Sequence, residues 1–412
     1  MSLLSFDEAQ LQLLAGARPV TDIELLATFD AAGRVLAVPL TSVIAVPPLD
    51  NSSMDGYAVR SGDVTAVGTS LAIAQRIAAG SVGHSLAPGT AARIFTGAPI
   101  PPGADAVVMQ EMCAHDGDGR VAINHLPKPG DWIRRAGQDI RAGAEVLGAG
   151  TRLSPAHLGL AASVGFAALP VYRPLRVALF STGNELVMPG EVAAADLPPG
   201  AIYNSNRYLL RGLLQQLGCE VGDLGIVPDN LAAMRAALRE AAADHDLILT
   251  SGGVSVGEED HVRPAVQAEG ALALWKIAIK PGKPLAFGHV RSDSGLNGGK
   301  CAFIGLPGNP VSSFVTFVML VRPFILKMQG ALRQTPTALS LRADFDWPRP
   351  DARREFLRAR RNPAGGLELF PNQDSAVLTS AAWADGLVDN PPGQAIRRGD
   401  AVAFLPFSEL LY

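Results

Sequence analysis

The chain has 412 residues, of which 48% are hydrophobic and 18% are charged, and its formal net charge is -4 at pH 7. This length and composition predict roughly two to four packed domains and exclude a disordered chain. The negative net charge argues against a nucleic-acid partner held by bulk electrostatic attraction.

The cysteines and the apolar runs bear on the cellular location of the protein, and the histidines bear on whether it holds zinc. Cys113, Cys219 and Cys301 lie far apart and form no CxxC pair, which is typical of a reducing compartment without a disulfide framework. The seven histidines form no HExxH motif, so we expect no zinc site. The N-terminus lacks the basic and apolar regions of a signal peptide, and the most apolar run, residues 311–321, ends at Arg322 and is too short to span a bilayer. We therefore expect a cytoplasmic protein with no membrane partner.

The first third of the chain predicts one helix followed by a β-rich region. Phe6, Leu11 and Leu14 recur among polar residues over 5–15, which predicts a helix. Residues 51–145 show no helical period. Short apolar runs there are cut by turn-rich stretches such as "GAPIPPGAD" and "LPKPGD", which is typical of a small β-rich domain.

From Arg176 onward, strand-like and helix-like segments alternate. The expected strands are 176–181, 219–227, 246–251 and 301–306, and the expected helices are 205–217, 231–243, a segment ending at 266, and one beginning at Pro310. This alternation predicts an α/β domain with a parallel sheet covered by helices on both faces.

The helical signal stops after about residue 330. Short alternating runs and many turn residues over 340–412 predict a small β-barrel or sandwich. This region begins with an arginine-rich stretch, and we weigh a solvated strand face equally with a binding role. Its arginines are Arg349, Arg353, Arg354, Arg358, Arg360 and Arg361.

Three loops of the α/β segment follow strands, at 181–186, 250–260 and 305–310. Because ligands bind beyond the carboxyl ends of strands in an open parallel sheet, we expect these loops to share one crevice. Glycines in the second loop suit the backbone of a phosphate site. In the third, Asn309 suits a helix N-cap and Pro310 the first helical position, so this loop is either an anion site or an ordinary capped helix. No loop fits the P-loop or the GxGxxG pattern.

Charged residues flank these loops. Lys276, Ala278 and Lys280 alternate, so both lysines are expected on one face of a strand, where they either hold an oxyanion or blunt an exposed sheet edge. Glu185 and Asp260 border the same crevice, and Mg²⁺ between carboxylate and phosphate would turn their repulsion into attraction. The acids at 258 and 259 are equally well explained as the start of a helix.

Several motifs together resemble the molybdopterin molybdenumtransferases, that is, the bacterial MoeA proteins and the E-domain of gephyrin. They read "DNSSMDGYAVR" (50–60), "RIFTGAPIPPGADAVVMQE" (93–111), "RRAGQDI" (134–140), "STGNEL" (181–186), "TSGGVSVGEED" (250–260), "KIAIKPGKP" (276–284) and "GLPGNPVSS" (305–313). The resemblance implies a discontinuous linker domain (1–50 and 146–173), an inserted β-rich domain (51–145), an α/β domain like molybdopterin adenylyltransferase (174–330) and a C-terminal β-barrel (331–412).

The resemblance also implies a reaction. Mg²⁺-dependent cleavage of adenylylated molybdopterin would release AMP and insert molybdate, in an elongated homodimer whose active site is shared between subunits. Contacts with molybdopterin adenylyltransferase and with molybdoenzymes that accept the cofactor are implied as well. Two other readings remain open at this point: an ATP-dependent adenylyltransferase, and a non-catalytic scaffold of the gephyrin type.

Carried over position by position, the resemblance implies specific site residues. The catalytic set is Asp55, Thr96, Asp139, Asp229 and Asp260, with Glu185 and Asp260 as metal ligands. The substrate-binding set is Ser251, Gly252, Gly253, Ser255, Lys276, Lys280, Pro307, Gly308, Asn309, Pro310, Arg354 and Ser375, with Arg358 as a further candidate. Asp229 is also placed to cap the helix that starts near Leu231. Asn184 stands where many relatives have Asp, which removes one charge from that loop.

Overall fold

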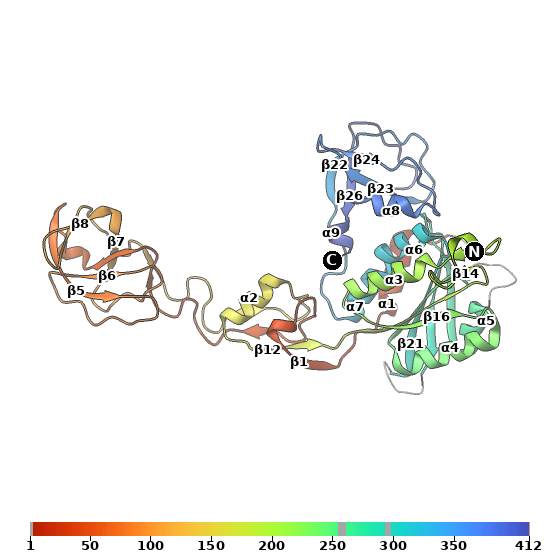
Figure 1. Cartoon of the computed structure of the whole chain (residues 1–412), viewed down its shortest axis with the longest axis horizontal. Helices are drawn as coiled ribbons and strands as arrows, with labels where there is room; N and C mark the ends of the chain where they lie inside the picture. The colour runs from red at the N-terminus through yellow and green to blue at the C-terminus, as the bar shows by residue number, and fades with distance from the viewer. Residues whose placement is uncertain (1–2, 254–260, 293–297, 412) are drawn as a thin grey trace.

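The computed structural model describes residues 3–253, 261–292 and 298–411. Figure 1 shows an elongated molecule. The inserted β-domain lies at one end, a narrow linker region occupies the middle, and the α/β and C-terminal domains lie together at the other end.

The sequence predicts a parallel sheet in the α/β domain, but the observed sheet is mixed. Its order is β16 (Glu220–Val227), β13 (Arg176–Thr182), β17 (Leu247–Ser251), β21 (Lys300–Leu306), β20 (Pro284–Arg291) and β18 (Gly270–Lys276). The first four strands are parallel, whereas β20 and β18 run antiparallel to their neighbours. The connections into and out of β20, residues 277–283 and 292–299, are shorter than the dozen or so residues that a parallel crossover needs, so these strands reverse direction instead.

Helices cover both faces of this sheet, as the alternating pattern predicts. Successive residues of β13 point to opposite faces: Leu179 packs in the core beneath α3 (Ser205–Gln216), and Phe180 packs against α4 (Leu231–Asp244). The second face is completed by α5 (Val262–Glu269), which contacts α4 and β20. The central strands β13 and β17 are buried on both sides, and their sequences are correspondingly rich in apolar residues.

One long helical segment runs through the first core. It comprises α6 (Pro310–Thr316), the π-helical turn η6 (Phe317–Val321) and α7 (Arg322–Met328). Among the described residues this is the one helix long and apolar enough to cross a membrane, and 94% of it is buried inside the protein. The helix passes through Arg322, where the expected apolar run ended, and that side chain is itself buried.

The N-terminal helix α1 (Phe6–Gly16) lies with the α/β domain, although the resemblance assigned residues 1–50 to the linker. Its buried stripe of Phe6, Ala9 and Leu13 joins the first core, and it contacts α7. Phe6 also makes an edge-to-face contact with Phe356 of the C-terminal domain, with ring centroids 5.4 Å apart. The first segment of the chain therefore helps to hold two domains together.

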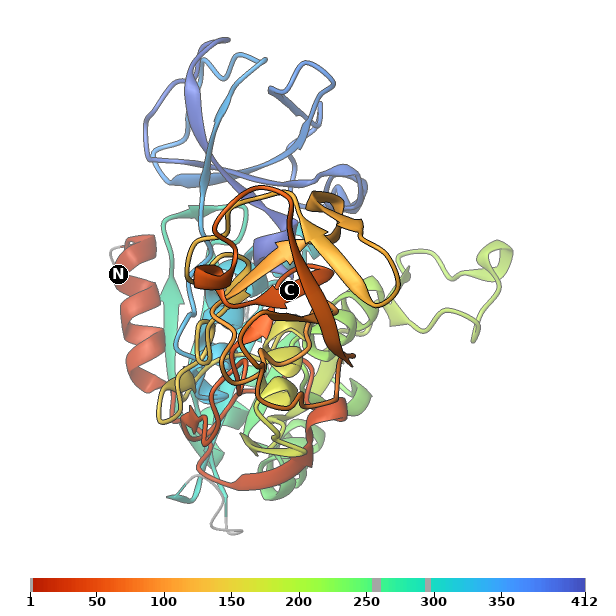
Figure 2. The same cartoon turned by 90° about the vertical axis from the view of Figure 1, so that its left-hand side faces the viewer.

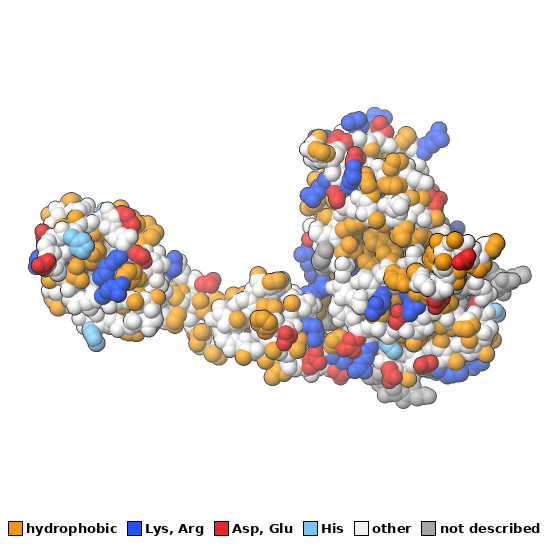
Figure 3. All heavy atoms as spheres, in the orientation of Figure 1, with side chains coloured by type: hydrophobic (Ala, Val, Ile, Leu, Met, Phe, Trp, Pro, Cys, Tyr) orange, Lys and Arg blue, Asp and Glu red, His pale blue; other side chains and the backbone are white. Residues whose placement is uncertain are grey.

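Short antiparallel pairs build the linker region. The strand β1 (Ile23–Ala27) pairs with β12 (Ala168–Tyr172), β2 (Leu40–Thr41) pairs with β11 (Glu145–Leu147), and α2 (Pro155–Ser163) packs beside them. Apolar side chains are exposed here: Leu25 is 75% exposed, Phe29 95% and Val43 84%. Figure 3 shows apolar side chains over the surface of this region.

The inserted region is β-rich, as its sequence predicts. Its sheet has the order β7 (Ala106–Met109), β4 (Gly56–Val59), β6 (Thr90–Ile94), β5 (Thr69–Ile77), β9 (Arg120–Ile123) and β8 (Cys113–His115). Two further short strands, β3 (Asn51–Ser52) and β10 (Ile133–Arg134), pair at its junction with the linker. Figure 2 views the molecule from this end.

The C-terminal domain is a small barrel that incorporates a strand from elsewhere in the chain. Its order is β19 (Ile279–Lys280), β23 (Arg354–Arg361), β25 (Gly386–Asn390), β26 (Ala401–Pro406) and β22 (Leu339–Arg342). The strand β24 (Leu367–Leu369) pairs with β23, and a bridge from Ala343 to Leu367 closes the circuit. Two short helices, α8 (Leu378–Trp383) and α9 (Phe407–Leu410), complete the domain.

Candidate active site

A cavity of about 1230 Å³ lies where the α/β domain meets the C-terminal domain. Its walls include the loops that follow β13, β17 and β21, the turn at 280–284 and the loop at 373–376. The three strand-end loops therefore converge at one edge of the sheet, as the sequence predicts. We call this cavity the cleft.

Twelve of the predicted site residues line the cleft: Glu185, Asp229, Ser251, Gly252, Gly253, Lys276, Lys280, Pro307, Gly308, Asn309, Pro310 and Ser375. Two others, Ser255 and Asp260, lie outside the described residues. The remaining predicted residues lie elsewhere in the fold.

The loop that follows β17, here called the glycine loop, requires glycine at positions 252 and 253. Gly252 and Gly253 have φ angles of +88° and +63°. A Cβ on Gly252 would lie 2.7 Å from the carbonyl oxygen of Thr182, and one on Gly253 would lie 2.3 Å from Val262. The backbone there can thus curl tightly and approach a ligand only because no side chain is present.

The loop that leads into α6 is held by the C-terminal domain. Asn309 stands at the N-cap position as expected, but its side chain makes no capping hydrogen bond; Nδ2 donates instead to Ser375 Oγ at 3.0 Å. The Val311 amide donates to the Ser375 carbonyl at 3.0 Å. This loop therefore does more than cap a helix, since it joins the two walls of the cleft.

Three polar side chains of the cleft that sequence reasoning missed each have one atom without a hydrogen-bond partner among the described residues. Thr182 Oγ1, Asn204 Nδ2 and Asn206 Oδ1 are buried, and none has a hydrogen-bond partner within the described part of the chain. Buried polar atoms are normally paired, because an unpaired one costs about 1–3 kcal/mol. Such atoms in a cleft are suited to a ligand's donors and acceptors. The sequence signal for the two asparagines is the "NSN" at 204–206, and Thr182 lies in the "STGNEL" loop.

The two predicted lysines line the cleft, but not from one strand. Lys276 ends β18, whereas Lys280 lies in β19 and pairs with β23 of the C-terminal domain. The alternation over 276–280 does not form one strand, because the chain leaves the α/β sheet after Lys276. Lys283 and Arg353 also line the cleft, so four of its lining residues carry a positive charge.

The arginine that lines the cleft is Arg353 rather than Arg354. Arg354 forms a two-pronged pair with Asp389, with both distances 2.6 Å, and its Nη1 lies 2.9 Å from Asp7. The pairing with Asp389 raises the pKa of Arg354. These contacts engage the Arg354 guanidinium outside the cleft, so the structure does not support the predicted substrate contact at Arg354.

Arg358 is buried and does not reach the cleft either. Its side chain is 1% exposed, and burial lowers its pKa to about 10. It donates to Ser380 Oγ and to the Asp374 carbonyl, and its amide donates to Gln373 Oε1. Arg358 therefore holds the loop at 373–376, which supplies Ser375 to the cleft.

The carboxylates of the cleft fit a divalent cation shared with a phosphate. Glu185 and Asp229 both line it, and Asp229 does not cap α4, because Asn230 Oδ1 accepts the hydrogen bond from the Ala233 amide at 2.9 Å. Across the described ranges no group of three His, Cys, Asp or Glu side chains forms a metal cage. One or two carboxylates plus substrate phosphates are the usual ligands of Mg²⁺, so the donor set suits that ion.

The predicted residues of the inserted domain lie far from this cleft within one chain. Asp55 precedes β4 and Thr96 follows β6, in the domain that Figure 1 places at the opposite end of the molecule. Asp55 Oδ1 accepts hydrogen bonds from Thr96 N at 2.8 Å and Thr96 Oγ1 at 2.7 Å, and these bonds lower the pKa of Asp55. Asp139 lines a separate cavity of about 790 Å³ with Arg135 and Arg141.

Known proteins resemble the chain along nearly its whole length. Residues 4–165 match the MoeA N-terminal region (domain I and II), 178–327 match a probable molybdopterin binding domain, and 340–407 match the MoeA C-terminal region (domain IV). The molybdopterin molybdenumtransferase of Haemophilus influenzae is 42% identical over 99% of this chain and 100% of its own length. The chain belongs to the MoeA family.

Further relatives agree with this assignment. The molybdopterin molybdenumtransferase of a Nostoc species is 39% identical over 90% of this chain and 86% of its own length. The crystal structure of the MoeA protein of Pyrococcus horikoshii superposes with a TM-score of 0.83 at 28% identity, and the match covers 98% of this chain and 100% of that one. The MoeA fold thus extends over all four parts of the molecule.

The glycine loop gives a first prediction. Gly252→Ala should lower the free energy of unfolding of the α/β domain by about 1–3 kcal/mol, because alanine is strained at a positive φ and its Cβ meets the Thr182 carbonyl. The matched control is Gly308→Ala, whose Cβ meets nothing within 4 Å and which should change stability by about 0.5 kcal/mol or less. Chemical unfolding of both variants measures the difference, and equal stabilities would contradict the argument.

A second prediction concerns the pair in the inserted domain. Thr96→Val should raise the pKa of Asp55 toward its ordinary value, because the hydrogen bond from the hydroxyl to the carboxylate is lost while the one from the backbone amide remains. A depressed carboxyl pKa stabilises the fold above the unfolded-state pKa. The stability difference between parent and variant should therefore vanish as the pH falls through the pKa of Asp55.

Side-chain NMR titration of protein carrying ¹³C-labelled aspartate measures this shift. Thr90→Val is the control, because the Thr90 hydroxyl donates to the Ala87 carbonyl and does not contact Asp55. An Asp55 titration that is unchanged in Thr96→Val, or shifted equally in the control, would show that Thr96 does not set this pKa.

Proposed function

We propose that this protein inserts molybdate into adenylylated molybdopterin with release of AMP, giving molybdenum-molybdopterin in molybdenum cofactor biosynthesis. The observation that carries the proposal is the composition of the cleft: a glycine loop, four cations and three carboxylates, among them Glu185 and Asp229, converge in one cavity. The names of the full-length relatives support the same reaction.

The reaction joins two anions, which this arrangement suits. The backbone of Gly252 and Gly253 can approach a phosphate closely, and the unpaired polar atoms of Asn204 and Asn206 are placed to meet the bound substrate. Lys280, Lys283 and Arg353 supply positive charge for molybdate on the facing wall. Their local charge can offset the repulsion between the reactants although the protein as a whole is acidic.

Glu185 and Asp229 would hold Mg²⁺, which would supply electrostatic polarisation of the phosphoanhydride when bound. The glycine loop then orients the phosphate, and the lysines orient the oxyanion toward the dithiolene end of the pterin. Each of these tasks uses side chains or backbone that line the cavity.

We further propose that the protein acts as a homodimer with each active site shared between subunits. The inserted domain of one chain lies far from that chain's own cleft, so Asp55, Thr96 and Asp139 could serve only the cleft of a second copy. The exposed apolar side chains of Leu25 and Phe29 in the linker offer a surface for such an association. The same proposal places the protein in the cytoplasm, where its cysteines would remain free.

The reaction itself is tested by AMP release. Purified protein with adenylylated molybdopterin should release AMP only when both molybdate and Mg²⁺ are present, and removal of the metal with a chelator should stop the release. Pyrophosphate formation from ATP and molybdopterin would favour an adenylyltransferase instead. No turnover in either assay would favour a scaffold.

Subunit sharing is tested by complementation. Asp55→Asn and Lys280→Gln should each lower AMP release at least tenfold as pure homodimers. A mixture allowed to exchange subunits should recover activity, to at most about a quarter of the parent, because half of the dimers are mixed and each has one intact site. A mixture that gains nothing, under conditions where exchange is confirmed by mass, would rule out the shared site.

A further inference from the structure

A buried carboxylate of the C-terminal domain stands directly behind Lys280. Glu355 lies on β23 and is 0% exposed. Its Oε1 accepts from Lys280 Nζ at 3.2 Å, and its Oε2 accepts from Trp347 Nε1 at 2.8 Å and from Asn390 Nδ2 at 3.2 Å. Within the described part of the chain, the hydrogen bonds to this carboxylate thus come from one cation and two neutral donors.

Backbone pairing brings the two side chains together. The strand β19 joins the C-terminal sheet by parallel pairing with β23, in a register that sets Lys280 beside Glu355. The Arg354 amide donates to the Ala278 carbonyl at 2.9 Å and continues this pairing. The position of Lys280 therefore depends on the C-terminal domain, although the residue comes from the α/β segment of the chain.

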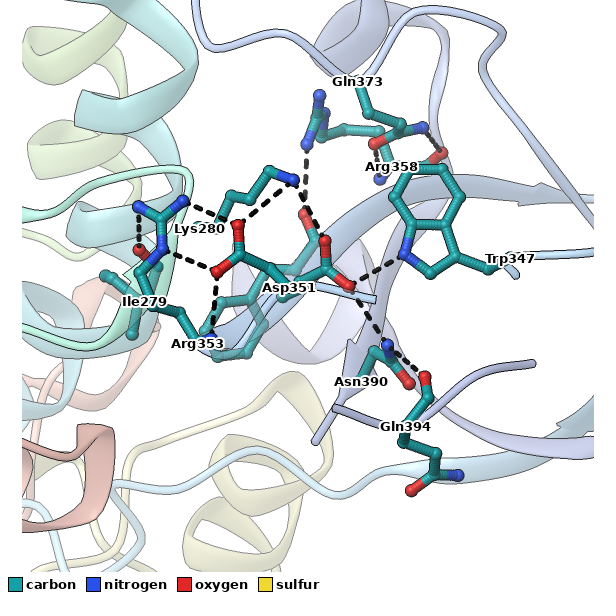
Figure 4. A network of polar contacts seen from close by, with 11 residues as sticks. Ile279, Lys280, Trp347, Asp351, Arg353, Arg358, Gln373, Asn390 and Gln394 are labelled. Atoms are coloured by element: carbon teal, nitrogen blue, oxygen red, sulfur yellow. Dashed lines mark hydrogen bonds and ion pairs between the residues drawn. The ribbon is translucent and has the colours of Figure 1, made fainter. Parts of the chain in front are cut away.

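A second acid, Asp351, contributes less to holding Lys280. Its oxygens are engaged by Arg353, at 2.9 Å from Nε and 2.8 Å from Nη2, and this pairing lowers the pKa of Asp351. Lys280 Nζ lies 3.5 Å from Asp351 Oδ2, farther than from Glu355. In Figure 4 Asp351 lies between Lys280 and Arg353.

The donors of Lys280 are divided between the acids and the cleft. An ammonium group has three N–H donors, and two face Glu355 and Asp351. Its side chain remains 39% exposed and lines the cleft, so the third donor is available to an anion. Within the described residues, Lys280 is the cation at ion-pair distance from Glu355, and a buried carboxylate needs such a partner.

We propose that Glu355 is a positioning residue, which holds the Lys280 ammonium at the wall of the cleft and so sets the affinity for the oxyanion. The inference rests on the proposed function, because it assumes that the oxyanion binds at Lys280. Glu355 touches neither reactant and acts through Lys280. The C-terminal domain is then part of the anion site as well as a wall of it.

The decisive variant is Glu355→Gln, which keeps the shape of the side chain. Glutamine has one acceptor oxygen, and Trp347 and Asn390 both donate to that side of Glu355. The amide NH₂ would then face the ammonium, and Lys280 would leave its position. The half-saturating molybdate concentration should rise about tenfold, whereas that of the pterin substrate should stay unchanged.

A double-mutant cycle separates this role from a structural one. Lys280→Gln should raise the molybdate requirement by itself, and adding Glu355→Gln to it should change the value less than about threefold, because the residue through which Glu355 acts is gone. Additive effects would overturn the proposal. So would tighter molybdate binding in Glu355→Gln, since Glu355 would then merely neutralise the lysine.

Two further variants serve as controls for misfolding and for non-specific effects. Glu368→Gln alters an exposed carboxylate of the same domain, paired with Arg360, and should leave the molybdate requirement unchanged. Trp347→Phe keeps an aromatic side chain at 347 and leaves the charge of Glu355 unchanged, but it removes one hydrogen bond that orients Glu355. It should therefore shift the molybdate requirement in the same direction by a smaller factor. An unchanged molybdate requirement in both Glu355→Gln and Trp347→Phe would reject the inference.

A direct measurement of molybdate binding tests the role of Glu355 without relying on turnover. Equilibrium dialysis of the full chain against molybdate, without pterin substrate, should show the same order of affinities: parent and Glu368→Gln tightest, Trp347→Phe intermediate, Glu355→Gln weakest. If the parent binds molybdate but releases no AMP, the proposed function fails while this ranking still tests Glu355. If the parent releases AMP but the ranking is absent, only the role of Glu355 fails.

Discussion

The proposed reaction brings two anions together in one cavity, and the distribution of charge around the cleft suits that constraint. Charges of one sign repel strongly at short distance, by about 4 kcal/mol at 4 Å for an effective dielectric near 20. The parallel pairing of β13, β17 and β21 places three strand ends at one edge, where backbone donors, lysines and carboxylates meet. Counter-charge is thus concentrated locally in a chain whose net charge is -4.

Much of this arrangement follows from the sequence because it depends on local pattern. Apolar runs predict the buried strands, and amphipathic spacing predicts α3 with its buried Leu210 and Leu214. Glycines at positive φ mark the loop after β17. Since the carboxyl ends of neighbouring parallel strands must lie at one edge, the convergence of these loops is a consequence of strand direction alone.

The errors arise where tertiary pairing overrides local pattern. Alternation over 276–280 suggested one strand, but the chain changes sheets between its two lysines. Arg353 and Arg354 are adjacent and chemically alike, and each pairs with an acid, so nothing in the local sequence tells which of them lines the cleft. The contact between the N-terminal helix α1 and α7 could not be predicted from the sequence either. Amphipathic spacing indicates which side of a helix is buried, but it does not indicate which element packs against that side.

The C-terminal domain makes the cleft depend on contacts that are remote in sequence. It borrows β19 from the α/β segment, holds α1 through Phe6 and Phe356, and bonds the loop before α6 through Ser375. Arg358 in turn supports the loop that carries Ser375, although it lies beneath the surface. Such a domain cannot shift without moving Lys280, Arg353 and Ser375 together, because all three are tied to β23 or to the loop that packs on it. Lys280 and Arg353 therefore belong to a different domain from the glycine loop after β17, and their distance from that loop is set by the contacts between the two domains rather than by either one alone.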